Sequence, residues 1–138
     1  MKIVKKKLII SLLFVIVTVL GACNNSSNDE VDADNENTNN LINTEELVEG
    51  EWIDTKGEHQ ENAGMYHTQS IDYSSSNEYA LFANSYVSYY NAEEFIKTIR
   101  YSGEVKDIPH NLESVEDADN VILSFSEQWV DEIELIKE

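Results

Sequence analysis

Short runs in which apolar and polar residues alternate dominate the chain beyond residue 50. In the clearest run, Val121, Leu123 and Phe125 occupy every second position. A period of two puts alternate side chains on one face of a β-strand, so these three residues predict a strand whose apolar face meets the core. Comparable runs rich in β-formers are residues 51–53, 65–71, 79–83, 86–90, 95–101 and 132–136.

Turn-forming residues separate these runs. They cluster at residues 74–77, 84–85, 91–94 and 102–103. Residues 92–101 also fit a helix, but hairpin-like neighbours favour a strand there. Before the first strand, residues 41–49 predict a short strand or a helical turn, with a helix start at Asn43. Short strands at this spacing predict an all-β fold, a single antiparallel β-sandwich over residues 41–138.

The first 22 residues have a different pattern. Lys2, Lys5, Lys6 and Lys7 precede an uncharged apolar run from Leu8 to Leu20. A basic segment followed by a short apolar segment is typical of a secretory signal peptide. The apolar run is shorter than the ~20 residues that a membrane-spanning helix needs, which disfavours the alternative of an uncleaved anchor.

The only cysteine of the chain follows this leader directly. Leu20, Gly21, Ala22 and Cys23 resemble the lipobox of bacterial lipoproteins, in which two small residues precede a cysteine that becomes lipidated. The resemblance implies a signal peptide over residues 1–22, a lipid on Cys23 and a place at the cell membrane, on its extracytoplasmic face. More than one acyl chain gives stable membrane anchoring. A single cysteine also excludes an intrachain disulfide and a cysteine-based zinc cluster.

Residues 24–40 contain no aromatic residue, and their only apolar side chains are Val31 and Ala33. Such a segment buries too little surface to offset the entropy of ordering it. Together with Cys23 it therefore predicts a disordered acidic tether over residues 23–40.

The chain has 27 acidic and nine basic residues. This imbalance disfavours nucleic acid as a partner, because phosphate contacts need clustered lysine and arginine.

Residues 48–138 resemble the jelly-roll, galactose-binding-like modules of carbohydrate-binding proteins. The resemblance is carried, in order, by residues 68–71, 78–81, 87–96, 119–125 and 130–135. It departs at Asn91, where those modules often have Asp, and at Ile122, where they have Arg. It implies a sandwich scaffold and a sugar-binding role, but no particular ligand, because such modules share a scaffold rather than one site.

Exposed aromatic rings are the side chains that stack on sugars. Tyr73 and Tyr86 are secondary candidates for sugar binding. Each candidate ring, whether primary or secondary, could instead fill the core. Trp129 is the best candidate for exposure because it lies in a polar segment. The ligand-binding residues predicted from the sequence are Trp52, Tyr66, Tyr90 and Trp129.

Acidic clusters raise the alternative of a structural calcium ion, although no EF-hand spacing is present. The candidate ligands are Glu116, Asp117, Asp119 and Asn120, or Asp131, Glu132 and Glu134. A solvated loop is the simpler interpretation of either cluster. Three scattered histidines disfavour a metal site built from histidine alone.

Nothing in the chain predicts catalysis: there is no nucleophile elbow, phosphate loop or glycine-rich fingerprint. We therefore expect a protein that is not an enzyme and needs no cofactor. The leading expectation is a lipid-anchored domain that binds a neutral envelope or host glycan. The first alternative is a protein-interaction domain of the cell surface, which would expose a contiguous apolar patch. The second is a small hydrolase with converging carboxylates of unequal pKa.

Overall fold

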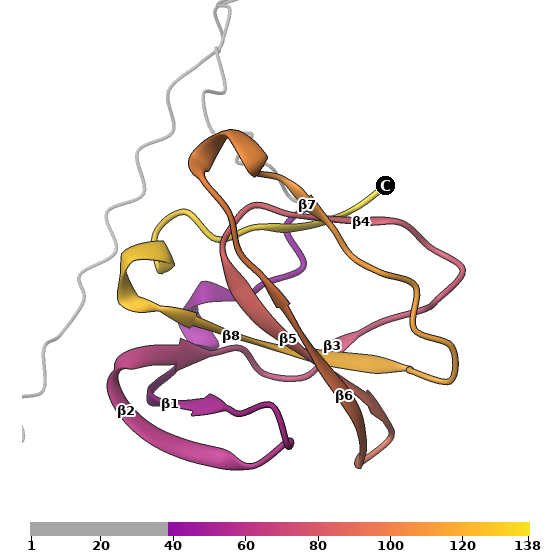
Figure 1. The fold of residues 1–138 in the computed structure, drawn as a ribbon, viewed down its shortest axis with the longest axis horizontal. Helices are drawn as coiled ribbons and strands as arrows, with labels where there is room; N and C mark the ends of the chain where they lie inside the picture. Colours follow the sequence, from indigo (N-terminus) through magenta and orange to yellow (C-terminus); the bar gives the residue numbers. More distant parts are fainter. Residues whose placement is uncertain (1–38) are drawn as a thin grey trace, which may run out of the picture. The chain divides into compact units, whose positions relative to one another are not determined.

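The computed structural model describes residues 39–138. The predicted signal peptide, Cys23 and most of the predicted tether lie outside these residues. Two antiparallel sheets build the described part of the chain (Figure 1). Apolar side chains of both sheets pack against each other in one core, so the predicted β-sandwich is confirmed.

The larger sheet has six strands in the order β1-β2-β8-β5-β6, and β3 also pairs with β8. The smaller sheet has the order β7-β4-β9. The strands are β1 (Val48–Ile53), β2 (His59–His67), β3 (Ile71–Asp72), β4 (Tyr79–Leu81), β5 (Ser85–Asn91), β6 (Glu94–Tyr101), β7 (His110–Asn111), β8 (Asn120–Ser126) and β9 (Leu135–Lys137). Within residues 39–138 the helices are single 3-10 turns, η1 (Thr44–Glu46), η2 (Val105–Asp107) and η3 (Glu127–Trp129).

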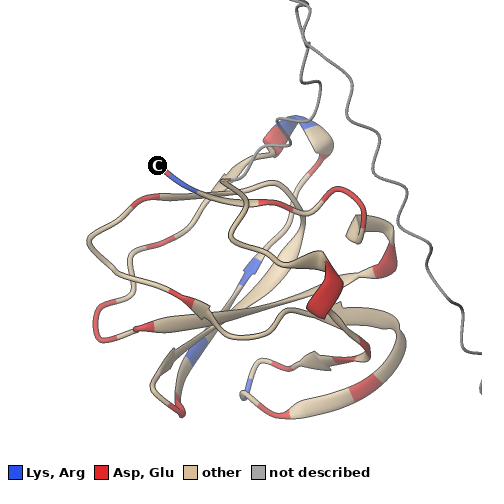
Figure 2. Ribbon diagram, turned by 180° about the vertical axis from the view of Figure 1, so that it is seen from behind, with Lys and Arg blue, Asp and Glu red and all other residues tan. Residues whose placement is uncertain are grey.

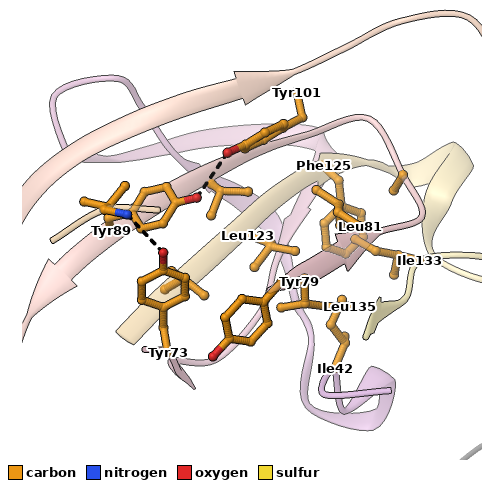
Figure 3. Close-up of a cluster of buried hydrophobic side chains, with 14 of the residues drawn as sticks. Ile42, Tyr73, Tyr79, Leu81, Tyr89, Tyr101, Leu123, Phe125, Ile133 and Leu135 are labelled. Atoms are coloured by element: carbon orange, nitrogen blue, oxygen red, sulfur yellow. Dashed lines mark hydrogen bonds between the residues drawn. The ribbon is translucent and has the colours of Figure 1, made fainter. Parts of the chain in front are cut away.

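The core lies between the two sheets (Figure 3). Val121, Leu123 and Phe125 of β8 are all buried in it, as their alternation predicts. Leu81 of β4 and Leu135 of β9 supply the opposing layer. β8 pairs with β2, β3 and β5, so it is the central strand of the larger sheet.

The other face of β8 is also covered, because the β1–β2 hairpin folds back over it. Ser88 and Ser124 are fully buried on this face. The Ile53 N–H donates to the Ser124 hydroxyl at 2.9 Å, and the Thr98 hydroxyl donates to the Asp54 carbonyl at 3.2 Å. These bonds tie the hairpin to the sheet beneath it, and the first of them satisfies polar groups that are buried from water.

Two predicted strands change most in the structure, while β1 begins earlier than predicted, at Val48, and β4 ends earlier, at Leu81. The run 65–71 is divided: β2 begins earlier, at His59, and ends at His67, and β3 is separate. Thr68 leaves the ladder because its N–H donates to the Leu123 carbonyl and its hydroxyl accepts from the Leu123 N–H. The run 132–136 is shortened to β9, since the chain from η3 to Ile133 is a turn closed by the Ile133 N–H on the Trp129 carbonyl.

Asn40 lies within the folded part. Its side-chain oxygen accepts the N–H groups of Ile42 and Leu135, each at 3.0 Å, and its amide nitrogen donates to the Ile133 carbonyl. A domain produced without the preceding segment should therefore begin before Asn40.

Acidic residues are spread over the loops and strands of the fold, and the few basic residues lie apart from one another (Figure 2). In the described region the basic residues are Lys56, Lys97, Arg100, Lys106 and Lys137. These five residues do not gather into a basic patch within residues 39–138. Of the helices in residues 39–138, none has the length and apolar character to cross a membrane.

Candidate functional site

An open hollow of about 230 Å³ lies where β8 runs into η3 and β5 begins. Four aromatic residues line it: Tyr86 from β5 and Trp129 from η3 are half-buried, whereas Tyr101 and Phe125 belong to the core. The remaining lining is mainly polar and consists of Met65, Asn84, Ser85, Arg100, Ser102, Ser124, Ser126 and Gln128. This mixture of aromatic and polar side chains makes it the strongest candidate for ligand binding.

Trp129 is half-buried, and its position follows from the turn that ends β8. The Val130 N–H donates to the Glu127 carbonyl and the Ile133 N–H to the Trp129 carbonyl. One side of the indole packs on the core, while the rest borders the hollow and a shallower one beside it that reaches Val105. Sequence reasoning therefore selected a residue that does reach a surface cavity.

Tyr86 is held from two sides. Its ring centroid is 5.2 Å from that of Trp52, at a tilt of 54°. The Arg100 guanidinium lies over the ring, 5.6 Å from its centroid. A cation over an aromatic face is attracted by the electron density of the ring. Trp52, a predicted site residue, is thus a support for Tyr86 and does not itself line the hollow.

Two amides border the hollow, and they differ in their freedom to bind a ligand. The Asn84 side chain is committed: it donates to the Gly103 carbonyl and accepts from the Gly103 N–H, and its oxygen also contacts His110 Nε2 at 2.9 Å. The Gln128 side chain is exposed and makes no hydrogen bond within residues 39–138. Gln128 is therefore the amide that can meet a ligand here.

The remaining predicted aromatics lie elsewhere. Tyr66 stacks on Phe125 with ring centroids 6.4 Å apart, and a hydrogen bond with the Glu49 carboxylate, assisted by its charge, raises the pKa of the Tyr66 phenol. Tyr90 meets Phe95 edge to face at 5.7 Å near the far end of β5, and burial raises the pKa of its phenol. The four predicted residues therefore do not form one site.

The first acidic cluster considered for calcium is engaged in holding a hairpin. Both Asp119 carboxylate oxygens accept the Ala92 N–H, at 2.9 and 3.1 Å, and the Asn120 amide donates to the Ala92 carbonyl at 3.0 Å. Ala92 has a φ of 51°, a left-handed conformation, in the tight turn between β5 and β6. These side chains stabilise that turn.

One group of three metal-ligating side chains does converge within residues 39–138: Glu51, His59 and His67. Sequence reasoning treated the histidines as scattered and missed this cluster. The missing signal is the pairing register of β1 and β2, which no local pattern shows.

Comparisons of the whole chain with protein-family models, with curated proteins and with solved structures find no match.

Proposed function

We propose that the protein is a lipid-anchored, extracytoplasmic surface protein whose sandwich domain binds a neutral glycan without transforming it. The observation that carries the proposal is the hollow bordered by Tyr86, Trp129 and Gln128. The likeness of the chain to lipoproteins and to galactose-binding-like modules adds to it.

The side chains of the hollow suit a sugar. An aromatic ring offers an apolar face for the apolar side of a pyranose, and its fixed position costs little conformational entropy on binding. An amide such as Gln128 can donate to and accept from hydroxyl groups. Arg100 adds donors at the inner edge, over Tyr86. A few polar groups placed around an apolar surface are typical of small-ligand sites.

The charge of the chain favours a neutral glycan over an anionic one. With 27 acidic residues, the protein repels polymers such as those that carry phosphate. Loss of the leader with Lys2, Lys5, Lys6 and Lys7 would leave five basic residues. The anchor and tether would hold the domain among surface polymers, where many copies gain avidity from weak single sites.

The rival function, docking of a partner protein, has less support. In residues 39–138 the exposed large apolar side chains are Leu41, Ile96 and Val105. They come from three different parts of the fold: the segment before η1, the strand β6 and the turn η2. Protein-docking surfaces usually present a contiguous apolar patch.

Removal of the Trp129 ring should weaken glycan binding. A panel of neutral oligosaccharides identifies a ligand, and titration calorimetry then compares variants of the protein. We expect Trp129→Ala to raise the Kd at least tenfold, about 1.4 kcal/mol, because the main stacking face is lost. Gln128→Ala removes an exposed side chain without touching the core, and it should raise the Kd by a smaller factor.

Tyr90→Ala is the matched control, since it removes an aromatic ring at the other end of β5. Circular dichroism verifies that each variant is folded. If no member of the panel binds to the folded protein, or if Tyr90→Ala weakens binding as much as Trp129→Ala, the proposed site is wrong and the protein-docking function moves ahead.

Replacement of Cys23 should abolish lipidation. Cys23→Ala removes the thiol that would carry the lipid, so the full chain, produced in a bacterium that processes lipoproteins, should accumulate as unlipidated precursor. Detergent phase partitioning and the mass of the processed chain measure this. Asn28→Ala in the predicted tether serves as the control. Unchanged mass and partitioning of the Cys23→Ala protein would reject the anchor.

A further inference from the structure

The folded-back β1–β2 hairpin brings three metal-ligating side chains to one place. Glu51 Oε2 lies 3.5 Å from His59 Nδ1 and 3.7 Å from His67 Nε2. All three ligand atoms lie within 4.8 Å of one another. The cluster is separate from the hollow at Trp129, because it shares no residue with the lining of that hollow.

The close approach of the two histidines requires a strong bend of β2. His67 lies eight positions after His59, which corresponds to about 26 Å along a straight strand. Their ring centroids are instead 5.5 Å apart. Figure 1 shows the bend of β2 around β1. Side chains on the inner side of such a bend converge.

The pairing register shows where the bend arises. Glu51 pairs with Glu61, whereas Glu49 pairs with Tyr66, so residues 62–65 of β2 face the single residue Gly50 of β1. Gly50 has a φ of +82°, which a residue with a side chain rarely adopts. The irregularity therefore lies directly beside Glu51 and between the two histidines of β2.

His67 is oriented as a metal ligand. The residue is only 6% exposed, and Nδ1 lies 2.8 Å from the Thr68 carbonyl. A carbonyl can only accept, so Nδ1 carries a proton, and in the neutral form of the ring the lone pair is on Nε2. Nε2 is buried and has no hydrogen-bond partner, the only such side-chain atom found in the described part of the chain. Metal-bound histidines usually donate their other N–H to a carbonyl or carboxylate in this way.

Glu51 and His59 form an open entrance to this buried nitrogen. Their side chains are 43% and 61% exposed, so an ion can reach the cluster from solvent. Bonds of about 2.0–2.1 Å to a tetrahedral ion place its ligand atoms about 3.4 Å apart. The observed 3.5 and 3.7 Å from Glu51 need only a slight contraction. The third pair, His59 and His67, lies within 4.8 Å, and the exposed His59 side chain can move closer on binding.

We propose that Glu51, His59 and His67 bind one zinc-like divalent transition-metal ion, with water completing the coordination. Imidazole nitrogens select ions of this class, because calcium and magnesium prefer a shell of oxygen ligands. The ion would connect β1 to both ends of β2 and so hold the folded hairpin in place. Glu49 and Glu61 line a shallow hollow next to Glu51 and add negative charge that attracts cations.

Zinc titration of the full chain, purified in detergent and freed of metal with a chelator, tests the proposal. We expect one equivalent of Zn²⁺ to bind, and cobalt substituted for zinc to show the visible absorption of a tetrahedral ion. At a zinc concentration about 100-fold above the Kd, the Tm should rise by about 10 °C or more.

Two exposed ligands allow the site to be altered without damage to the core. Glu51→Gln and His59→Ala should each weaken zinc binding at least tenfold and reduce the Tm increase. His67→Ala should abolish binding, although its burial also makes it a test of folding. The matched controls are His110→Gln and Glu94→Gln, which remove the third histidine and an exposed carboxylate outside the cluster and should leave the Kd unchanged.

The proposal is overturned if no zinc binds stoichiometrically, which would leave only a weak contact between Glu51 and His67. It is also overturned if calcium competes equally well with zinc, or if the control substitutions weaken zinc binding as much as Glu51→Gln does. Either result would mean that the ion responds to acidic charge alone. Zinc binding by the Trp129→Ala protein should be normal. The metal site therefore stands or falls separately from the glycan site.

Discussion

Phe125→Ala should lower the free energy of unfolding by about 3–5 kcal/mol, the range for removal of a fully buried aromatic ring. Phe125 is 1% exposed and lies in the core cluster between the two sheets. Tyr66 stacks on it from β2, so the loss leaves both a cavity and an unsupported ring. Because small domains have a total stability of about 5–15 kcal/mol, the variant should be close to unfolding at growth temperature.

Urea denaturation followed by tryptophan fluorescence measures this effect. Ile96→Ala is the control, since Ile96 lies on β6 with 37% of its surface exposed and should change the stability by less than about 1 kcal/mol. A Phe125→Ala protein as stable as Ile96→Ala would mean that β8 does not turn this face towards the core.

Strands β5, β6 and β8 were the most predictable part of the fold. In β8 the alternation of apolar side chains corresponds to burial on one face, and the turn residues between 91 and 94 do join β5 to β6. Local pattern suffices in both places because one strand pair and its turn determine the geometry. The ambiguous segment 92–101 forms the strand β6 from Glu94 onward for the same reason, since β6 pairs along the length of β5.

The hairpin that covers the second face was not predictable. β2 begins in the polar sequence from His59 to Ala63, where the exposed positions give no alternation of apolar residues. The hairpin packs over β8 through buried polar contacts such as the hydrogen bond from the Ile53 N–H to the Ser124 hydroxyl, which links residues 71 positions apart. Short-range patterns carry no information on such contacts. From the sequence alone, Ser124 would be expected to face solvent, although it is fully buried in the structure.

The candidate sites also differ in how far the sequence alone could predict them. Trp129 could be selected because its polar neighbours indicated exposure. Tyr86 was only a secondary candidate, because its position in the hollow depends on Trp52 and Arg100 from other strands. The Glu51, His59 and His67 cluster depends on the register shift at Gly50, which becomes visible only when β1 and β2 are paired.

Alkaline pH should destabilise the protein through a buried tyrosine network. Tyr89 is fully buried, and its hydroxyl lies 3.2 Å from that of Tyr101 (Figure 3). The Tyr101 hydroxyl accepts the Glu113 N–H at 2.8 Å, and the Tyr73 hydroxyl accepts the Val115 N–H at 3.1 Å. The hydroxyls thus hold the segment before β8 to the larger sheet.

Burial raises the pKa of Tyr89 well above its usual value of 10.0, and its hydrogen bond with Tyr101 adds to the increase. Burial also raises the pKa of Tyr101, although its bonds with Tyr89 and Glu113 act in the opposite direction. Above about pH 10 the unfolded chain loses these protons while the folded chain keeps them. The unfolded state then binds fewer protons, so stability is constant below this pH and falls above it.

The loss should be on the order of 1–3 kcal/mol by about pH 11, since each tyrosine that stays protonated only in the folded state contributes about 1.4 kcal/mol per pH unit. Urea denaturation at a series of pH values, at fixed high salt to screen the repulsion among the acidic residues, measures it.

Tyr89→Phe should cost about 1 kcal/mol at neutral pH through the lost hydrogen bond. It should also flatten the alkaline decline, because one of the two protons no longer distinguishes the folded from the unfolded chain. An equally steep decline in Tyr89→Phe and Tyr101→Phe would assign the alkaline unfolding to other groups and exclude the tyrosine network as its cause.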